Sequence, residues 1–449
     1  MKNPHSHASW SPRPVATVVR GGGTGENYSL LYNDIHAAYQ NALRWHISGD
    51  GTFAATASGI LNTWSRTLVA VTGNADRFLA AGIYGFQFAV AADLLRGYAG
   101  FDLAGTQEML TRVFYPMNDQ FLTGHNGAHI SNYWANWDLC TMNSILAIGV
   151  FCDRPDLVNQ AVSYFKNGGG NGSIKNAVPI IHPNGLGQWQ ESGRDQGHTM
   201  MGIGQMGTFC EMAWNQGIDL YGYDDSRFLK GAEYVAQYNL GFDVPFSTYT
   251  WHTGQGGTLA SQTVISAASR GQARPVWELV YNHYVNRRGL SAPHVAQFAA
   301  QVRPEGGGGD YGPNSGGYDQ LGFGTLTFSQ PPLVPLPVAP STESAPQTPA
   351  SESAPQTPAS ESAAEVMKPS AAEPSAATSS SSAATPSPRP TAGSLKSLAS
   401  ESTELTGAKA ASDRAGILGG SAGVLAMGGA VGGALFLRSR KRDDEDRQH

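Results

Sequence analysis

Apolar residues recur at three- and four-residue steps along most of the first 300 positions. Near the start of the chain, Leu31, Ile35, Ala38, Ala42 and Trp45 fall on one face of a helix. The same pattern returns between Gly, Asn, Asp and Pro residues in segments 55–71, 75–98, 102–122, 133–152, 154–168, 197–223, 226–241 and 274–289. No segment alternates like a β-strand over any length. An all-α fold is therefore predicted for residues 1–328.

The helical segments are not copies of one another. Eight or more amphipathic helices joined by Gly-rich loops, without a repeat of about 30–45 residues, favour paired helices that close into an (α/α) toroid over a regular solenoid. Periodicity does not show the closure itself.

The composition changes abruptly near residue 330. All nine Trp and all seventeen Tyr precede it, whereas residues 329–414 are almost entirely Pro, Ser, Ala, Thr and Glu and contain APQTPASES twice. Such a segment buries too little apolar surface to offset the entropy of ordering it. We expect a disordered stalk there.

Residues 415–437 contain no charged side chain and are followed at once by RSRKR. This pattern predicts a transmembrane helix with a cytoplasmic tail at 438–449, so that the helical domain lies outside the cell at its surface. The first residues, MKNPHSHASWSPRP, lack the apolar stretch of an export signal. We therefore expect that a piece is missing from the N-terminus.

Charge and cysteine content exclude some classes of function. The net charge is −6 and the aromatic-rich part has no long basic run, so no nucleic-acid partner is expected. The three cysteines form no CxxC zinc pattern. His125 and His129 have a ligand-like spacing, but neither HExxH nor a third ligand accompanies them. No metal or other cofactor is expected, and the oligomeric state is not indicated.

Residues 125–140, HNGAHISNYWANWDLC, interleave imidazole and amide groups with aromatic rings. His129, Trp134, Asn136 and Trp137 are typical of a sugar site, where ring faces stack on pyranose C–H surfaces and amides bind hydroxyl groups and carboxylates. The alternative is an ordinary helix start followed by core tryptophans.

Residues 185–199, GLGQWQESGRDQGHT, are dense in polar groups just before an apolar helix. Burying so many costs desolvation unless they serve a site. The helix N-terminus would also favour a bound carboxylate. The alternative is an interhelical salt-bridge cluster of Glu191, Arg194 and Asp195.

Residues 269–284, SRGQARPVWELVYNHY, form the third polar segment. Arg274 and Tyr281 are seven residues apart, which places them on one helical face two turns apart. Pro275 suits the first turn of that helix. Tyr281 as an ordinary core aromatic is an equally good interpretation.

Residues 21–328 resemble the alginate-lyase-like domain of bacterial and fungal polysaccharide lyases. The most specific words are NYWANWDLC, QWQESGRDQGH and RPVWELVYNHY. The resemblance implies an (α/α) toroid and β-elimination of an acidic, uronate-containing polysaccharide such as alginate or glucuronan.

The resemblance also implies roles for single residues. Asn136 and His198, with a protonated Glu191, match the residues that neutralise the substrate carboxylate. Tyr281 matches the residue that moves the proton, with Arg274 lowering its pKa; Tyr249 and Tyr284 are rivals for this role. The residues expected to bind the polymer are His129, Trp134, Trp137, Gln188, Trp189, Arg194, Gln196 and Tyr249.

Two other functions fit the same sequence. A glycoside hydrolase would use two carboxylates such as Glu191 and Asp195. These two acids are four positions apart on one segment, a spacing that poorly suits opposite sides of a glycosidic bond. A surface protein that binds carbohydrate without cleaving it fits the expected stalk and anchor equally well.

Overall fold

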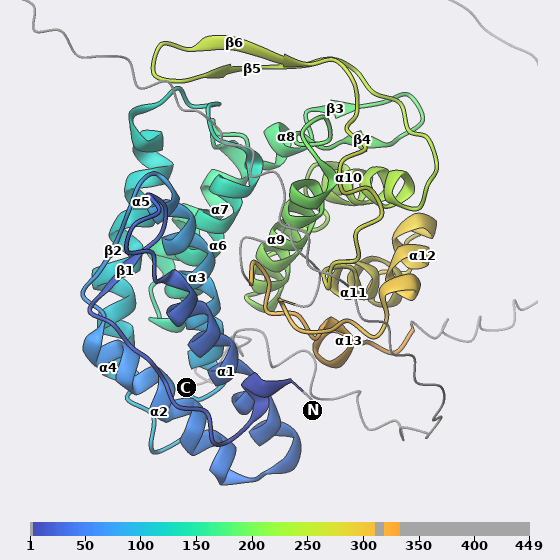
Figure 1. Ribbon diagram of the computed structural model, residues 1–449. Coiled ribbons are helices and arrows are strands. Elements are labelled where there is room, and N and C mark those ends of the chain that lie inside the picture. The colour runs from blue at the N-terminus through green and yellow to red at the C-terminus, as the bar shows by residue number, and fades with distance from the viewer. Residues whose placement is uncertain (1–2, 310–317, 333–449) are drawn as a thin grey trace, which may run out of the picture. The chain divides into compact units, whose positions relative to one another are not determined.

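The computed structural model describes residues 3–309 and 318–332, which are mostly helical (Figure 1). The helices are α1 (Tyr28–Ser48), α2 (Gly51–Thr67), α3 (Asp76–Asp93), α4 (Leu103–Met109), α5 (Tyr115–Gly124), α6 (Ala135–Phe151), α7 (Pro155–Asn167), α8 (Ile174–Ala177), α9 (Gln196–Asn215), α10 (Tyr223–Asn239), α11 (Trp277–Tyr281), α12 (Pro293–Val302) and α13 (Gly324–Thr327). Every segment predicted from periodicity contains a helix. The all-α class is confirmed, and closure into a toroid stays a prediction.

The helix ends follow from local sequence. Asp50 and Asp195 precede α2 and α9, and their carboxylates accept hydrogen bonds from the backbone N–H groups of Thr52 at 2.9 Å and His198 at 2.8 Å. Each bond satisfies a donor that has no partner inside the helix. Gly49 ends α1 in the left-handed conformation, at φ 71°.

Helix α6 forms the centre of the core. Its side chains are buried on all sides except at Trp137, and it packs against α3, α5, α7 and α9. Gly82 and Gly85 let α3 approach closely, because a Cβ atom at these positions would lie 2.5 Å from Cys140 Sγ and 2.2 Å from Ser144 Oγ. This packing fixes the start of α6 beside the start of α3.

Short strands accompany the helices. They pair as β1 (Thr17–Val19) with β2 (Ala70–Thr72) in parallel, and as β3 (Ile180–Ile181) with β4 (Gly187–Gln188) and β5 (Tyr249–Thr253) with β6 (Thr258–Gln262) antiparallel. The expectation that nothing alternates like a sheet is wrong for the β5–β6 hairpin. Its strands alternate between half-buried and exposed positions over too few residues for a clear pattern.

The hairpin is attached to the loop that precedes α6 (Figure 1). His129 N–H donates to the Gly254 carbonyl at 2.9 Å, and Gly254 N–H donates to Asn132 Oδ1 at 2.6 Å. Ser131 Oγ donates to the carbonyl and accepts from the N–H of His252, both at 3.0 Å. These bonds place β5 next to the start of α6.

The expected end of the domain at Phe328 is a packed position, where the side chain is buried against the core. The expected stalk beyond residue 332, the membrane helix at 415–437 and the tail at 438–449 lie outside the described residues. Within the described part, no helix is both long and apolar enough to cross a membrane.

Candidate active site

A cavity of about 240 Å³ lies where three helices begin. Its lining residues are Arg20, Asp76, Leu79, Asn136, Trp137, Arg194, His198, Met201 and Asp319. We call it the helix-end cavity, because Asp76, Asn136 and His198 belong to the first turns of α3, α6 and α9. Helix N-termini carry partial positive charge. The lining also holds two arginines, Arg20 and Arg194, and two aspartates, Asp76 and Asp319, so that its formal charges balance while the guanidinium groups remain donors for an anion.

Arg194 is fixed by three neighbours. Its Nη1 donates to Glu191 Oε2 at 3.2 Å, and its Nη2 lies 3.2 Å from His198 Nε2. The guanidinium also lies 5.0 Å from the centre of the Trp134 ring, a favourable cation–π contact. The cation is thus held at the cavity wall before any ligand binds.

The neighbours of His198 indicate which of its ring nitrogens donates and which accepts. Its Nδ1 lies 2.7 Å from Asp195 Oδ2, while Nε2 faces the Arg194 donor. Because a guanidinium can only donate, Nε2 accepts from Arg194 and Nδ1 donates to Asp195. Burial alone would raise the pKa of Asp195, but hydrogen bonds from the ring and the backbone N–H of His198, together with the charge of Arg194, outweigh it and hold that pKa below its usual value.

Glu191 is fully buried and supports the cavity from behind. Its Oε1 accepts the N–H of Asn136 at 3.0 Å, and its Oε2 lies 3.4 Å from Asn136 Nδ2. Burial raises the pKa of Glu191, and the charge of Arg194 opposes that rise. Glu191 therefore holds Asn136 and Arg194 in place and does not itself line the cavity.

Arg20, Asp76 and Asp319 were missed by sequence reasoning. The Arg20 guanidinium contacts the rings of both Tyr28 and Tyr84, 5.0 and 5.6 Å from their centres. The only sequence feature near Arg20 that could have indicated a site is the run of three glycines that follows it. Asp319 follows all three polar segments along the chain, in a stretch without a recognisable pattern.

Arg274 lies one layer behind the cavity. It pairs with Asp319 at 3.4 Å, and both side chains are buried. The expectation that Arg274 and Tyr281 share a helical face is wrong, because α11 begins only at Trp277 and Arg274 precedes it.

The two tyrosines expected on this segment do not occur among the residues that line the helix-end cavity. The Arg303 guanidinium lies over the ring of Tyr281, 5.3 Å from its centre. Tyr284 is buried, and its hydroxyl donates to the Tyr221 carbonyl at 2.9 Å.

Tyr249 lies on β5, near the acids behind the cavity, and like the other two tyrosines it is not among the described residues that line the helix-end cavity. Its hydroxyl donates to Asn171 Oδ1 at 3.1 Å, and its ring stacks on Trp251 at 5.6 Å. Trp251 in turn contacts Trp134, with 5.0 Å between the ring centres. Burial raises the pKa of Tyr249 to about 12, and the charge of Glu191 acts in the same direction.

Three expected binding residues instead stabilise the fold. Trp189 is fully buried. The amide of Gln188 bonds the backbone of Ser247 in both directions at 2.8 Å. The amide nitrogen of Gln196 donates to the carbonyls of Ser192 and Ser266. These hydrogen bonds within the protein explain the polar side chains of Gln188 and Gln196 without a ligand.

The remaining aromatic candidates lie closer to the site. Trp137 lines the cavity, and Trp134 lies under Arg194. His129 lies under the hairpin, with its ring 4.9 Å from that of His252.

His125 turns inward and bonds the buried Asp138 at 2.9 Å, so it does not face His129 as a second metal ligand would. In residues 3–309 and 318–332, no group of three or more His, Cys, Asp and Glu side chains could hold a metal ion.

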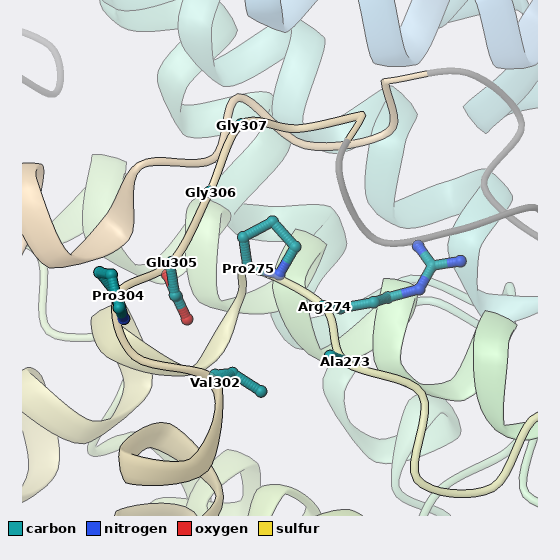
Figure 2. Close-up of a pocket in the computed structure, with 8 residues that line it drawn as sticks. All are labelled: Ala273, Arg274, Pro275, Val302, Pro304, Glu305, Gly306 and Gly307. Carbon is teal, nitrogen blue, oxygen red and sulfur yellow. The ribbon is translucent and has the colours of Figure 1, made fainter. Parts of the chain in front are cut away.

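A second cavity, of about 180 Å³, lies beside Glu305 (Figure 2). Glu305 Oε1 accepts the N–H groups of Trp277 and Glu278 at 2.6 and 2.9 Å, whereas Oε2 has no hydrogen-bond partner among the described residues. Burial raises the pKa of Glu305 to about 8. The Arg274 side chain points away from Glu305 (Figure 2). We call this the Glu305 cavity.

Residues 20–243 match the model of the alginate lyase family. This part of the chain is an alginate-lyase-like domain. The match makes the protein a polysaccharide lyase. The matched range includes Asn136, Arg194 and His198, whereas Tyr249 and Tyr281 lie beyond its end. A search of the curated proteins gives no match to this chain.

Solved structures of alginate lyase A1-III show a distant likeness. A histidine-to-alanine variant with a tetrasaccharide is 16% identical over 52% of this chain and 67% of its own, with a TM-score of 0.41. The apo form of that variant is 14% identical over 74% of this chain and 88% of its own, with a TM-score of 0.47. A tyrosine-to-phenylalanine variant with a tetrasaccharide is 16% identical over 52% of this chain and 72% of its own, with a TM-score of 0.37. Likeness at this level transfers no residue role to this chain.

Proposed function

We propose that this polysaccharide lyase cleaves a uronate polymer, of the alginate or glucuronan kind, by β-elimination in the helix-end cavity. The observation that supports this most directly is the convergence of three helix N-termini with Arg20 and Arg194. A uronate differs from a neutral sugar by its carboxylate. The fixed guanidinium donors and helix ends suit that group, while Asp76 and Asp319 in the same lining balance the charge of the two arginines.

The reaction removes the weakly acidic C5 proton next to the carboxylate. Negative charge then develops on the carboxylate as the enolate-like transition state forms, and donors fixed in advance stabilise it. In the proposed mechanism, Asn136 Nδ2 and the Arg194 guanidinium contact the carboxylate. Glu191 keeps both donors in position, since it bonds each of them.

We assign the proton transfer to Tyr249. When the substrate binds, the Tyr249 hydroxyl first releases its proton to water. The phenolate then takes the C5 proton, the C4–C5 double bond forms as the C4–O4 bond breaks, and the phenol returns the proton to O4. One tyrosine serves both steps when the two groups lie on the same face of the sugar. The chain of ring contacts from Tyr249 through Trp251 and Trp134 to Arg194 supports this choice over Tyr281.

A hydrolase mechanism has less support. Its two candidate acids, Glu191 and Asp195, are already bonded to Asn136, Arg194 and His198. A general acid and its partner need access to the scissile bond. No observation favours a binding protein that has lost catalysis.

The test is a panel of alginate, glucuronan and other polyuronates incubated with the purified protein. We expect the ultraviolet absorbance of the unsaturated product to grow in step with reducing ends for at least one polymer. Reducing ends without that absorbance would indicate a hydrolase. Binding with neither signal would indicate a non-catalytic protein, and either outcome would overturn the proposal.

A further inference from the structure

The glycine loop, residues 168–172 with the sequence GGGNG, presents Asn171 to Tyr249. Asn171 is buried, and its amide nitrogen donates to the carbonyls of Ser131 and Tyr133 at 2.8 and 2.7 Å. Its Oδ1 accepts the Tyr249 hydroxyl at 3.1 Å. The amide therefore has a fixed orientation, in which the oxygen faces Tyr249.

A buried polar network holds the loop. Asp138 Oδ2 accepts the N–H of Gly172 at 2.9 Å, and its Oδ1 bonds His125 Nε2 at 2.9 Å and the Tyr164 hydroxyl at 3.2 Å. His125 and Asp138 are buried and do not line the helix-end cavity. The network fixes the backbone that carries Asn171.

Glycine is required at two positions of the loop. A Cβ atom on Gly170 would lie 2.4 Å from Asp138 Oδ2, and one on Gly172 would lie 2.5 Å from Asp138 Cβ. The backbone approaches Asp138 too closely for any other residue. Asn176 adds bonds to the carbonyls of Gly169 and Gly170 at 3.1 and 2.9 Å. So rigid a loop suits a positioning role.

We propose that Asn171 is a positioning residue that orients the Tyr249 hydroxyl and keeps its proton in place until the substrate binds. The proposal rests on the proposed lyase function and on the role of Tyr249 in it. Among the described residues, Glu191 is the charged group that acts on Tyr249 from the elements packed against it, and Gln190 and Asn171 contribute uncharged amides.

The proposal makes opposite predictions for two substitutions. A hydrogen-bond acceptor stabilises the neutral phenol, so Asn171→Ala should lower the pKa of Tyr249 and move the rise of kcat/KM to lower pH. Asn171→Asp places a negative charge next to the phenol and should move that rise to higher pH. Because the ring is less well oriented, kcat should fall about 10²-fold in Asn171→Ala.

Asn171→Ser is a second variant in case the alanine protein does not fold. Its hydroxyl can still donate to one of the Ser131 and Tyr133 carbonyls, but it is too short to reach Tyr249, so the shift to lower pH should remain. Asn176→Ala is the matched control. It loosens the same loop without touching Tyr249, and we expect a lower melting temperature with an unmoved pH profile.

Tyr249→Phe separates failure of this inference from failure of the proposed function. If Tyr249→Phe is inactive and the Asn171 variants leave the pH profile unmoved, the positioning role is overturned and the lyase mechanism stands. If Tyr249→Phe is fully active, the proton transfer assigned to Tyr249 is overturned, and the positioning role of Asn171 is overturned with it. Adding Asn171→Ala to Tyr249→Phe should cost no further activity; an additional loss would show that Asn171 acts independently of the hydroxyl.

Discussion

The helix-end cavity and the Glu305 cavity both adjoin buried carboxyl groups, yet they differ in how those groups are paired. Behind the helix-end cavity, Glu191 and Asp195 each bond a donor from Arg194, Asn136 or His198. In the Glu305 cavity, one carboxyl oxygen has no partner among the described residues, and burial favours the protonated acid. A hollow alone therefore does not indicate a site for an anion; fixed donors and balanced charge do.

The largest difference should appear between two tyrosines. Tyr249→Phe removes the hydroxyl assigned to the proton transfer and should lower kcat about 10²–10⁴-fold, with substrate binding and melting temperature nearly unchanged. Tyr281→Phe is the matched control near the Glu305 cavity, where the Arg303 guanidinium covers its ring. It should retain activity. Steady-state kinetics on the polymer found in the panel measures both, and the reverse result would return the role to Tyr281.

Two arginines should differ in the property that they affect. Arg194→Met removes a charged donor from the helix-end cavity and should raise KM about 10–100-fold. Arg303→Met leaves the buried Glu278 without its cation. It should therefore lower the free energy of unfolding by about 1–3 kcal/mol and spare KM. Kinetics and urea unfolding on both variants check this. An unchanged KM in a folded Arg194→Met protein would remove Arg194 from substrate binding.

Glu305 should make stability depend on pH. Its pKa is about 8 in the folded protein against an ordinary value of 4.5, so folding favours the protonated form. The resulting stabilisation is fully present below the unfolded pKa and is lost as pH rises from 4.5 to about 8, by about 1.4 kcal/mol per pH unit at most.

Glu305→Gln should remove this dependence, because the amide keeps an acceptor for Trp277 and Glu278 but does not titrate. Urea unfolding across this pH range should give a flatter profile than the parent protein. The exposed Glu108→Gln is the control and should change nothing. An equally steep profile in Glu305→Gln would show that other groups cause it.

Sequence reasoning was strongest where one helix could be judged by itself. The apolar face of Leu31, Ile35, Ala38 and Ala42 is buried in α1, as predicted. Periodicity also placed Asn136 and His198 in the first turns of two helices. Their meeting at one cavity depends on the packing of α6 against α3 and α9, which no local pattern contains.

Sequence reasoning was weakest where a helix start or a short strand decided the geometry. Arg274 and Tyr281 have a helical spacing, but the helix starts between them, so the buried Asp319 pairs with Arg274 instead. The β5–β6 hairpin carries Tyr249, and its half-exposed alternation was too short to stand out. Arg20 is held at the cavity by tertiary packing against the rings of Tyr28 and Tyr84.

The central claim is that the helix-end cavity recognises the carboxylate of a uronate. Calorimetry on the Tyr249→Phe protein tests it, because substrate should bind there without being cleaved. We predict that a uronate oligosaccharide binds, that its carboxyl-reduced form binds at least about 10-fold more weakly, and that adding Arg194→Met abolishes the difference. Equal binding of the two oligosaccharides, or a difference that persists without Arg194, would contradict the account.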